Sequence, residues 1–229
     1  RHSVCKSILE HHHNPKSLTF DICVFRSQSQ FLGLPSSIPF FVTGGVLLGA
    51  LAAFFGGWID NVIMRMMDVI LGFPSLLLAI AIVAVLGPGI RNALFAIAIV
   101  TLPAYARLTR ASVLTVKELD FVKASIALGA SPTRLLLFRI LPNSLTPVVV
   151  LATLGIATAI LDAAGLSFLG LGAQPPTPEW GTMLGSERNQ VFSAPHLVFF
   201  PGIAIMITVL AFNLFGDGLR DALDPRLND

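Results

Sequence analysis

Charged side chains are scarce in this sequence. Of its 229 residues, 12% are charged and 54% are hydrophobic, and the mean hydropathy is +0.79. An ordinary soluble domain carries about 25% charged residues. The composition therefore argues against an ordinary soluble domain and favours a membrane protein.

The few charges are clustered, which leaves long uncharged runs. A helix needs about 20 apolar residues to cross a bilayer core. Four uncharged runs reach that length, at residues 39–59, 69–90, 140–161 and 197–216. A shorter run at 92–106 follows the turn-like sequence GPG at 87–89. The sequence thus predicts an all-α polytopic membrane helix bundle with about five spans.

The basic residues predict the orientation, because Lys and Arg beside spans mark the cytoplasmic side. Six of the fifteen Lys and Arg lie between the third and fourth predicted spans, and two follow the last span: Arg107, Arg110, Lys117, Lys123, Arg134, Arg139, Arg220 and Arg226. We therefore expect the loop at about 107–142 and the C-terminus to be cytoplasmic, and the loop at about 170–196 to be external. Asp162, near the outer end of the fourth span, is either a functional group or a solvated end residue.

The sequence also lacks the residues that catalysis would need. It contains no Gly-Lys pair, and therefore no phosphate-binding loop of the form G-x-x-x-x-G-K-[ST]. No His, Asp, Glu and Cys grouping has catalytic or metal-ligand spacing, so we predict no catalytic residue, metal or cofactor, and no nucleic-acid partner. Glu179, Trp180 and Glu187 fall in the predicted external loop, where we expect solvated charges. The substrate-binding residues are not predicted.

Residues 1–38 differ from the rest of the chain, which forms the predicted membrane domain at 39–229. They are polar and aperiodic, and they show no signal-peptide pattern. His11, His12 and His13 suggest a metal site, but adjacent histidines do not share a helix face, so a poorly ordered tail is the preferred interpretation. Cys5 and Cys23 can form a disulfide or remain two free thiols.

The loop between the third and fourth spans has a helical pattern of its own. In residues 118–128, Leu119, Val122 and Ile126 share one helix face. Gly129 then stands where a helix ends in a left-handed residue. Ser131 is expected to cap a second helix with its side chain, and Pro132 fits the first turn of that helix, which runs to a break at Pro142. An ordinary interfacial amphipathic loop would show a similar pattern.

This helix-turn-helix resembles the EAA loop of ABC-importer permeases, whose pattern is E-A-A, three residues, Gly, nine residues, then I-x-L-P. Ala124, Ser125 and Gly129 fall at the family positions, and Leu141-Pro142 stands at the family distance. Lys123 occupies the first Glu site and Arg139 the Ile site, with Ile140 one place late. A basic residue at the first site is familiar in the peptide branch of the family.

The resemblance covers residues 44–228. The segments FFGGWIDNVIMRMMDVILGFPSLLLAIAIVAVLGPGI, GLSFLGLGAQPPTPEWGTML and LAFNLFGDGLRDALDPRL are similar to the dipeptide/oligopeptide/nickel branch. Within it, the chain most resembles the second permease subunit of dipeptide importers. A first membrane helix and a GTD-x-x-GRD segment of that family have no counterpart here, which a truncated or frameshifted reading frame or an unusual variant would explain.

The resemblance implies the partners and the site. The partners are a second permease subunit, cytoplasmic ATP-binding subunits and an external substrate-binding protein, and the chain lies in the lipid bilayer of the cell inner membrane. The coupling residues that would contact the ATPase are Lys123, Ala124, Ser125, Gly129, Ala130, Ser131, Pro132, Arg134 and Pro142. Alternatives are a nickel-chelate importer, a truncated permease that binds or regulates without transporting, and a secondary transporter, which the EAA-like loop disfavours.

The first predicted span carries small residues at every fourth position: Gly45, Gly49, Ala53 and Gly57. Such a ridge lets a second helix approach closely. The simpler alternative is a membrane helix that tolerates glycine.

Overall fold

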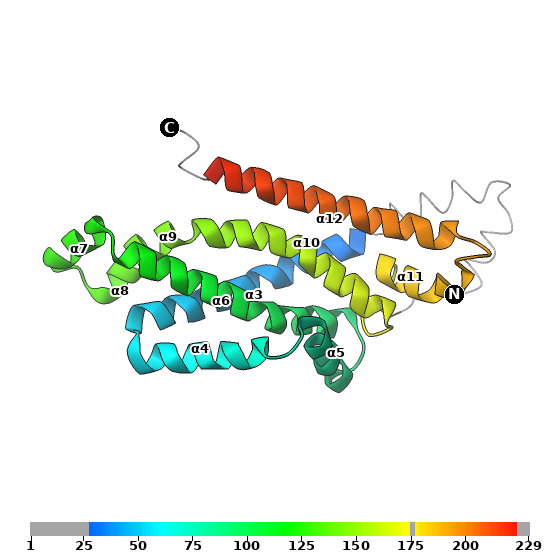
Figure 1. Ribbon diagram of the computed structural model, residues 1–229, viewed down its shortest axis with the longest axis horizontal. Helices are drawn as coiled ribbons and strands as arrows, with labels where there is room; N and C mark the ends of the chain where they lie inside the picture. Colours follow the sequence, from blue (N-terminus) through cyan, green and yellow to red (C-terminus); the bar gives the residue numbers. More distant parts are fainter. Residues whose placement is uncertain (1–27, 175–176, 224–229) are drawn as a thin grey trace.

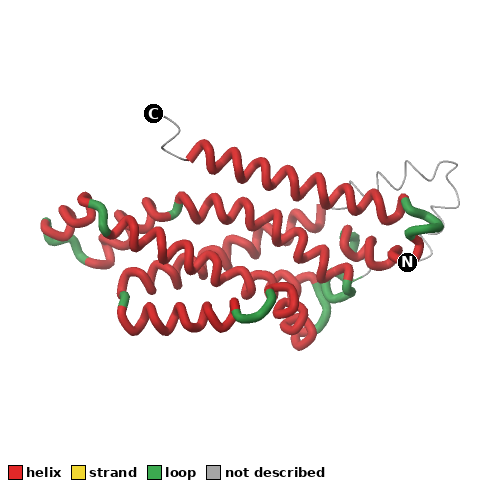
Figure 2. The backbone as a smooth tube through the Cα atoms, viewed as in Figure 1, coloured by secondary structure: helices red, strands yellow, loops and turns green. Residues whose placement is uncertain are grey.

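The computed structural model describes residues 28–174 and 177–223, and this part of the chain contains helices, turns and no strand (Figures 1 and 2). The predicted all-α fold is confirmed. The elements are α3 (Gln28–Phe55), α4 (Gly57–Leu71), α5 (Ser75–Leu86), α6 (Ile90–Lys117), α7 (Asp120–Ala127), α8 (Pro132–Leu135), the π-helix η1 (Leu136–Ile140), α9 (Leu141–Ser144), α10 (Thr146–Phe168), α11 (Trp180–Glu187), the 3₁₀ turn η2 (Arg188–Gln190) and α12 (His196–Leu223).

Three helices are long and apolar enough to cross a bilayer: α6, α10 and α12. The consecutive helices α4 and α5 pass the same test only when they are taken together, and they are bent by 89°. The Val42–Phe55 part of α3 is apolar but shorter. The described residues therefore hold three to four apolar spans, where the sequence predicted about five.

The predicted span at 69–90 is bent near its start. The chain breaks after Leu71, and α5 starts only at Ser75. Pro74 precedes that helix with an extended backbone, at φ −57° and ψ 127°. Proline has no N–H to donate and disfavours a helical conformation in the residue before it, so an uncharged run still bends here.

The helix α3 begins at Gln28, ahead of the predicted start of the membrane domain at residue 39. No charged residue lies between Arg26 and Asp60, and a helix satisfies its own backbone hydrogen bonds in an apolar setting. Residues 28–38 are therefore helical. The predictions for the three histidines and the two cysteines fall on residues 1–27, outside the described part of the chain.

The helices define two ends of the bundle. Figure 1 shows α7 and α8 at one end and α11 at the opposite end, while the last turns of α12 point towards the α7–α8 end and lie above the start of α10. A cluster of buried apolar side chains joins α5, α6 and α10 towards the α11 end. A second cluster joins α3, α6 and the short helices around residue 135. The segment from α7 to η1, called the coupling segment below, is thus packed onto the bundle and is continuous with its core.

The small-residue ridge of α3 lies against α6 of the same chain. A Cβ on Gly45 would lie 2.7 Å from Tyr105 Cβ, and a Cβ on Gly49 would lie 2.9 Å from Thr109 Cβ. Ala53 is buried in the cluster that includes Val113. Gly57 does not belong to the ridge: it lies beyond the end of α3, and a Cβ there would meet no atom within 4 Å.

We expect Gly49→Val to destabilise the chain, because the added methyl groups would press on the Ala106 carbonyl and on Thr109. Overpacking a close contact costs about 1–3 kcal/mol. Gly44→Val is the matched control on the same helix, since its Cβ would lie 3.9 Å from Leu102 Cδ1, an ordinary contact. Thermal unfolding in detergent measures both variants. Equal melting temperatures would contradict the close α3–α6 packing.

Candidate functional site

The turn after α7 is built around Gly129, which has a φ of +80°. The Gly129 N–H donates to the Ile126 carbonyl at 2.9 Å, and the Ala130 N–H donates to the Ser125 carbonyl at 3.1 Å. These two bonds form a Schellman motif, which closes a helix through a left-handed residue. The predicted left-handed conformation of Gly129 is confirmed. It turns the chain sharply between α7 and α8.

The second helix starts where the sequence predicted, but in a different manner. Ser131 has the extended backbone of an N-cap residue and Pro132 follows as the first helical residue, yet the Ser131 side chain makes no capping bond. The predicted side-chain cap is wrong, because the backbone alone starts this helix: the Leu135 N–H donates to the Ser131 carbonyl at 2.9 Å.

Pro142 does not end the second helix. After α8 the chain widens into the π-helix η1 and continues into α9, with Pro142 in the first turn of α9. Because proline has no N–H to donate, the helical path loses one backbone bond at this point. The predicted break is thus replaced by a continuous helical path from α8 towards α10. The predicted loop also starts too early, because α6 runs on to Lys117 and carries Arg107 and Arg110.

The coupling segment has one buried side and one exposed side. Val122, Leu135 and Ile140 are buried in the same cluster as α6 residues, so α7, α8 and η1 are anchored firmly. The sequence predicted one apolar face for Leu119, Val122 and Ile126. Val122 is buried, whereas Leu119 and Ile126 are exposed. Leu128 is 88% exposed and Phe138 is 72% exposed. This exposed apolar surface lies at the end of the molecule.

The same segment carries three basic side chains. Lys123 pairs with Glu118 at 3.7 Å, and both side chains are more than half exposed. Arg134 and Arg139 are exposed, and neither forms an ion pair within the described part of the chain. Exposed apolar side chains and unpaired cations in one segment are typical of a surface that a partner with acidic residues covers.

Two ion pairs tie α4 to α6 near the same end of the bundle. Arg110 Nε and Nη2 donate to the two carboxylate oxygens of Asp60, both at 2.5 Å. Arg107 Nη2 donates to Asp68 at 2.5 Å. Bidentate pairs such as Arg110–Asp60 fix geometry as well as charge. The sequence interpretation missed them, although Asp60 and Asp68, eight residues apart, are the only acidic residues of α4.

At the opposite end, Glu179 is 2% exposed, so the expected solvated charge is wrong. Its carboxylate accepts from the Thr182 N–H at 3.1 Å and from the Thr182 hydroxyl at 2.9 Å. Burial raises the pKa of the Glu179 carboxyl, while hydrogen bonds from Ser167, Thr182 and Gly181 lower it by a smaller amount. Glu179 therefore fastens the start of α11 to the end of α10.

The loop before α11 folds back along α10, which explains this burial. A Cβ on Gly181 would lie 2.7 Å from Ala164 Cα, so the backbones of α11 and α10 touch. Trp180 is buried as well, and it packs in a cluster with Ala164 and Ile205 of α12. Glu187, at the other end of α11, is only half-buried. Asp162 is half-buried on α10 and forms no hydrogen bond or ion pair with the described residues.

We expect Glu179→Gln to raise the melting temperature at pH 7 and to remove part of its pH dependence. A carboxyl whose pKa is raised by folding destabilises the folded state above that pKa, and this cost disappears as the pH falls through the raised value towards the ordinary one. Each pKa unit corresponds to about 1.4 kcal/mol. The wild type should therefore approach the stability of the Glu179→Gln variant as the pH falls.

Melting temperatures of the wild type, Glu179→Gln and the control Glu187→Gln across pH 4–8 test this expectation. A Glu179→Gln variant that is less stable than the wild type at every pH would show that the carboxylate's hydrogen bonds outweigh its burial.

Together, the apolar helices and the exposed helix pair at one end are typical of an integral membrane protein. Comparison with known proteins identifies the family. Residues 45–229 match the family described as "Binding-protein-dependent transport system inner membrane component". The chain belongs to this family.

Curated relatives of the chain are permease proteins. It is 55% identical over 192 residues to the dipeptide transport system permease protein DppC of Alkalihalophilus pseudofirmus. This match covers 82% of this chain and 63% of the relative. It is 55% identical to the di/tripeptide permease protein DppC of Pseudomonas aeruginosa over 88% of this chain and 66% of the relative. The glutathione permease protein GsiD of Escherichia coli is 55% identical over 76% of this chain and 57% of that protein.

The chain thus spans somewhat less than two thirds of the length of these relatives. Among solved structures, a chain of the MetNI methionine ABC transporter in an inward-facing conformation superposes with a TM-score of 0.71. It is 17% identical, and the match covers 93% of this chain and 100% of that chain. At this identity the likeness concerns the fold alone.

Proposed function

We propose that this chain is a permease subunit of an ATP-driven importer of short peptides and that it forms half of the translocation pathway. Its relatives are permeases of dipeptide, di/tripeptide and glutathione transport systems. Glutathione is itself a tripeptide, so these names share one substrate class. Short peptides are therefore the favoured cargo over a nickel chelate.

The observation that carries the proposal is the rigid turn between α7 and α8. It presents exposed apolar and basic side chains while its other side is anchored in the core. Such an element can transmit a movement of a bound partner to α6 and α10 without bending. We assign the contact with the ATPase to Lys123, Ala124, Ser125, Gly129, Ala130, Ser131, Pro132, Arg134 and Pro142.

The partners follow from the same proposal. The sequence has no phosphate-binding loop, so ATP hydrolysis requires separate cytoplasmic subunits and this chain is not the enzyme. A second permease subunit completes the pathway. An external substrate-binding protein delivers the peptide at the end of the bundle that carries α11.

Co-purification tests the proposed coupling. The tagged chain is expressed together with a second permease and an ATPase subunit of the same family and isolated in detergent. We expect the ATPase to remain bound. Retention of the second permease with complete loss of the ATPase would contradict the role of the α7–α8 turn.

We further expect the α7–α8 turn and the C-terminus to be cytoplasmic and the loop before α11 to be external, because the basic residues cluster at the first of these sites. Reporters inserted after Ala130, after Gln174 and at the C-terminus give the topology. An insertion at Ala130 is preferable to one within α6, since it leaves a long helix intact. An external signal at Ala130 would reverse the proposed orientation.

A further inference from the structure

The segment that joins α11 to α12 carries an apolar surface that the proposed transport function does not use. The segment consists of the turn η2, the stretch 191–195 and the first turn of α12, and its apolar surface begins at Val191. Phe192 is 99% exposed, Phe199 is 63% exposed and Val191 is 39% exposed. Fully exposed aromatic side chains are unusual on a water-facing loop.

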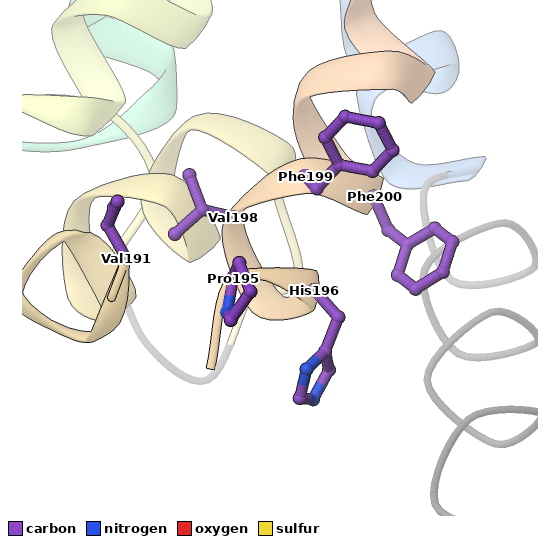
Figure 3. A pocket seen from close by; sticks show the side chains of 6 residues that line it. All are labelled: Val191, Pro195, His196, Val198, Phe199 and Phe200. Atoms are coloured by element: carbon purple, nitrogen blue, oxygen red, sulfur yellow. The ribbon is translucent and has the colours of Figure 1, made fainter. Parts of the chain in front are cut away.

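Beside these side chains lies a hollow of about 490 Å³, lined by Val191, Pro195, His196, Val198, Phe199 and Phe200. Figure 3 shows the two valines on one side of it and the two phenylalanines on the other, with the His196 ring pointing away from the phenylalanines. The lining is almost entirely apolar, and His196 is its one ionisable residue. A flexible apolar chain fits such a hollow better than a polar ligand does.

The position of the hollow indicates what covers it. α12 begins at His196, so the hollow lies where this span enters the bilayer. Farther along α12, Met206, Leu210 and Leu214 lie on the same helix face as Phe199, and they are 60%, 54% and 62% exposed. This stripe faces away from the described part of the chain. Phe199 belongs both to the stripe and to the lining of the hollow, so the stripe leads to the hollow.

The residues just before the loop have the opposite character. Arg188, Asn189 and Gln190 are all exposed and polar. A phospholipid matches both the apolar hollow and the polar turn η2, because its acyl chain is apolar and its phosphate is anionic.

We propose that the segment from Val191 to Phe200 is seated in the bilayer leaflet at the α11 end, with a phospholipid acyl chain in the hollow and Arg188 at the headgroup level. The loop then fixes the depth of α11, because η2 follows α11 directly. This inference requires that α12 spans the membrane and that lipid, not a protein partner, borders its Phe199 face. It does not depend on the transported substrate or on the ATPase.

Nitroxide labelling measures the depth directly. The full chain carries Cys5→Ser, Cys23→Ser and Phe192→Cys, is labelled with a nitroxide, and is reconstituted in vesicles of phosphatidylethanolamine and phosphatidylglycerol. A side chain that is 99% exposed can be replaced by the label without disturbing the fold. We expect more frequent collisions with oxygen, which concentrates in the bilayer, than with a water-soluble nickel chelate. Asn189→Cys in the same background is the control and should give the reverse order.

Two outcomes would overturn the proposal. A label at position 192 that meets the nickel chelate more often than oxygen would place the loop in water. A label that meets neither reagent would show that protein, either another part of this chain or a second copy, covers the surface in place of lipid.

Discussion

Gly129→Val should abolish the coupling of this chain to its ATPase while leaving membrane insertion intact. The φ of Gly129 is +80°, and a left-handed conformation costs a residue with a Cβ about 1–2 kcal/mol, with a further cost for a β-branched one. A Cβ at this position would meet no atom within 4 Å, so the cost arises from the backbone alone. The turn should open and separate α7 from α8. We expect peptide uptake to fall at least about tenfold, as a change of about 1.4 kcal/mol implies.

Gly129→Asn is the matched control, because asparagine tolerates the left-handed region. It should retain most of the uptake. ATPase co-purification and peptide uptake are measured for both variants, and detergent-extracted protein confirms insertion. Wild-type uptake with Val at position 129 would contradict the coupling role of the turn.

Leu128→Asp should weaken ATPase binding strongly without lowering the stability of the chain itself. Leu128 is 88% exposed, so it contributes little to the fold. Burying a leucine against a partner stabilises the complex by about 1.5–3 kcal/mol, which corresponds to a factor of roughly 10–150 in affinity. An aspartate would also place a negative charge beside the acidic partner surface that the basic residues here indicate.

Leu128→Met keeps the apolar area, so this variant should bind the ATPase almost as tightly as the wild type. It shows whether the loss in Leu128→Asp comes from the lost apolar contact or from any substitution at this position. Titration of the solubilised chain with the ATPase subunit gives the three affinities. If Leu128→Asp binds as tightly as the wild type, Leu128 lies outside the interface.

The local features of the coupling turn were predictable from the sequence because they depend on neighbouring residues. The left-handed Gly129 and the helix start at Pro132 follow from short-range backbone rules. The failure of Ser131 as a side-chain cap was not predictable, since a serine that can cap need not do so when the backbone already satisfies the turn. The π-helix after Leu135 left no pattern in the sequence.

Features that depend on the path of the chain were not predictable. Glu179 was expected in water, but α11 packs against α10 where Gly181 meets Ala164, and Glu179 bonds to Ser167 of α10. The ion pairs of α4 with Arg107 and Arg110 join residues about forty to fifty positions apart. The bend at Pro74 was hidden because the uncharged run continues through it, and charge was the criterion for a span.

ATP-driven uptake is the most direct test of the central proposal. Vesicles contain this chain, a second permease and the ATPase subunits, with the external binding protein and a radiolabelled dipeptide on the substrate side. We predict accumulation of the dipeptide that requires ATP and is lost when this chain is omitted. Binding of the dipeptide and the partners with no ATP-dependent accumulation would contradict the account, and it would assign the chain a binding or regulatory role in place of transport.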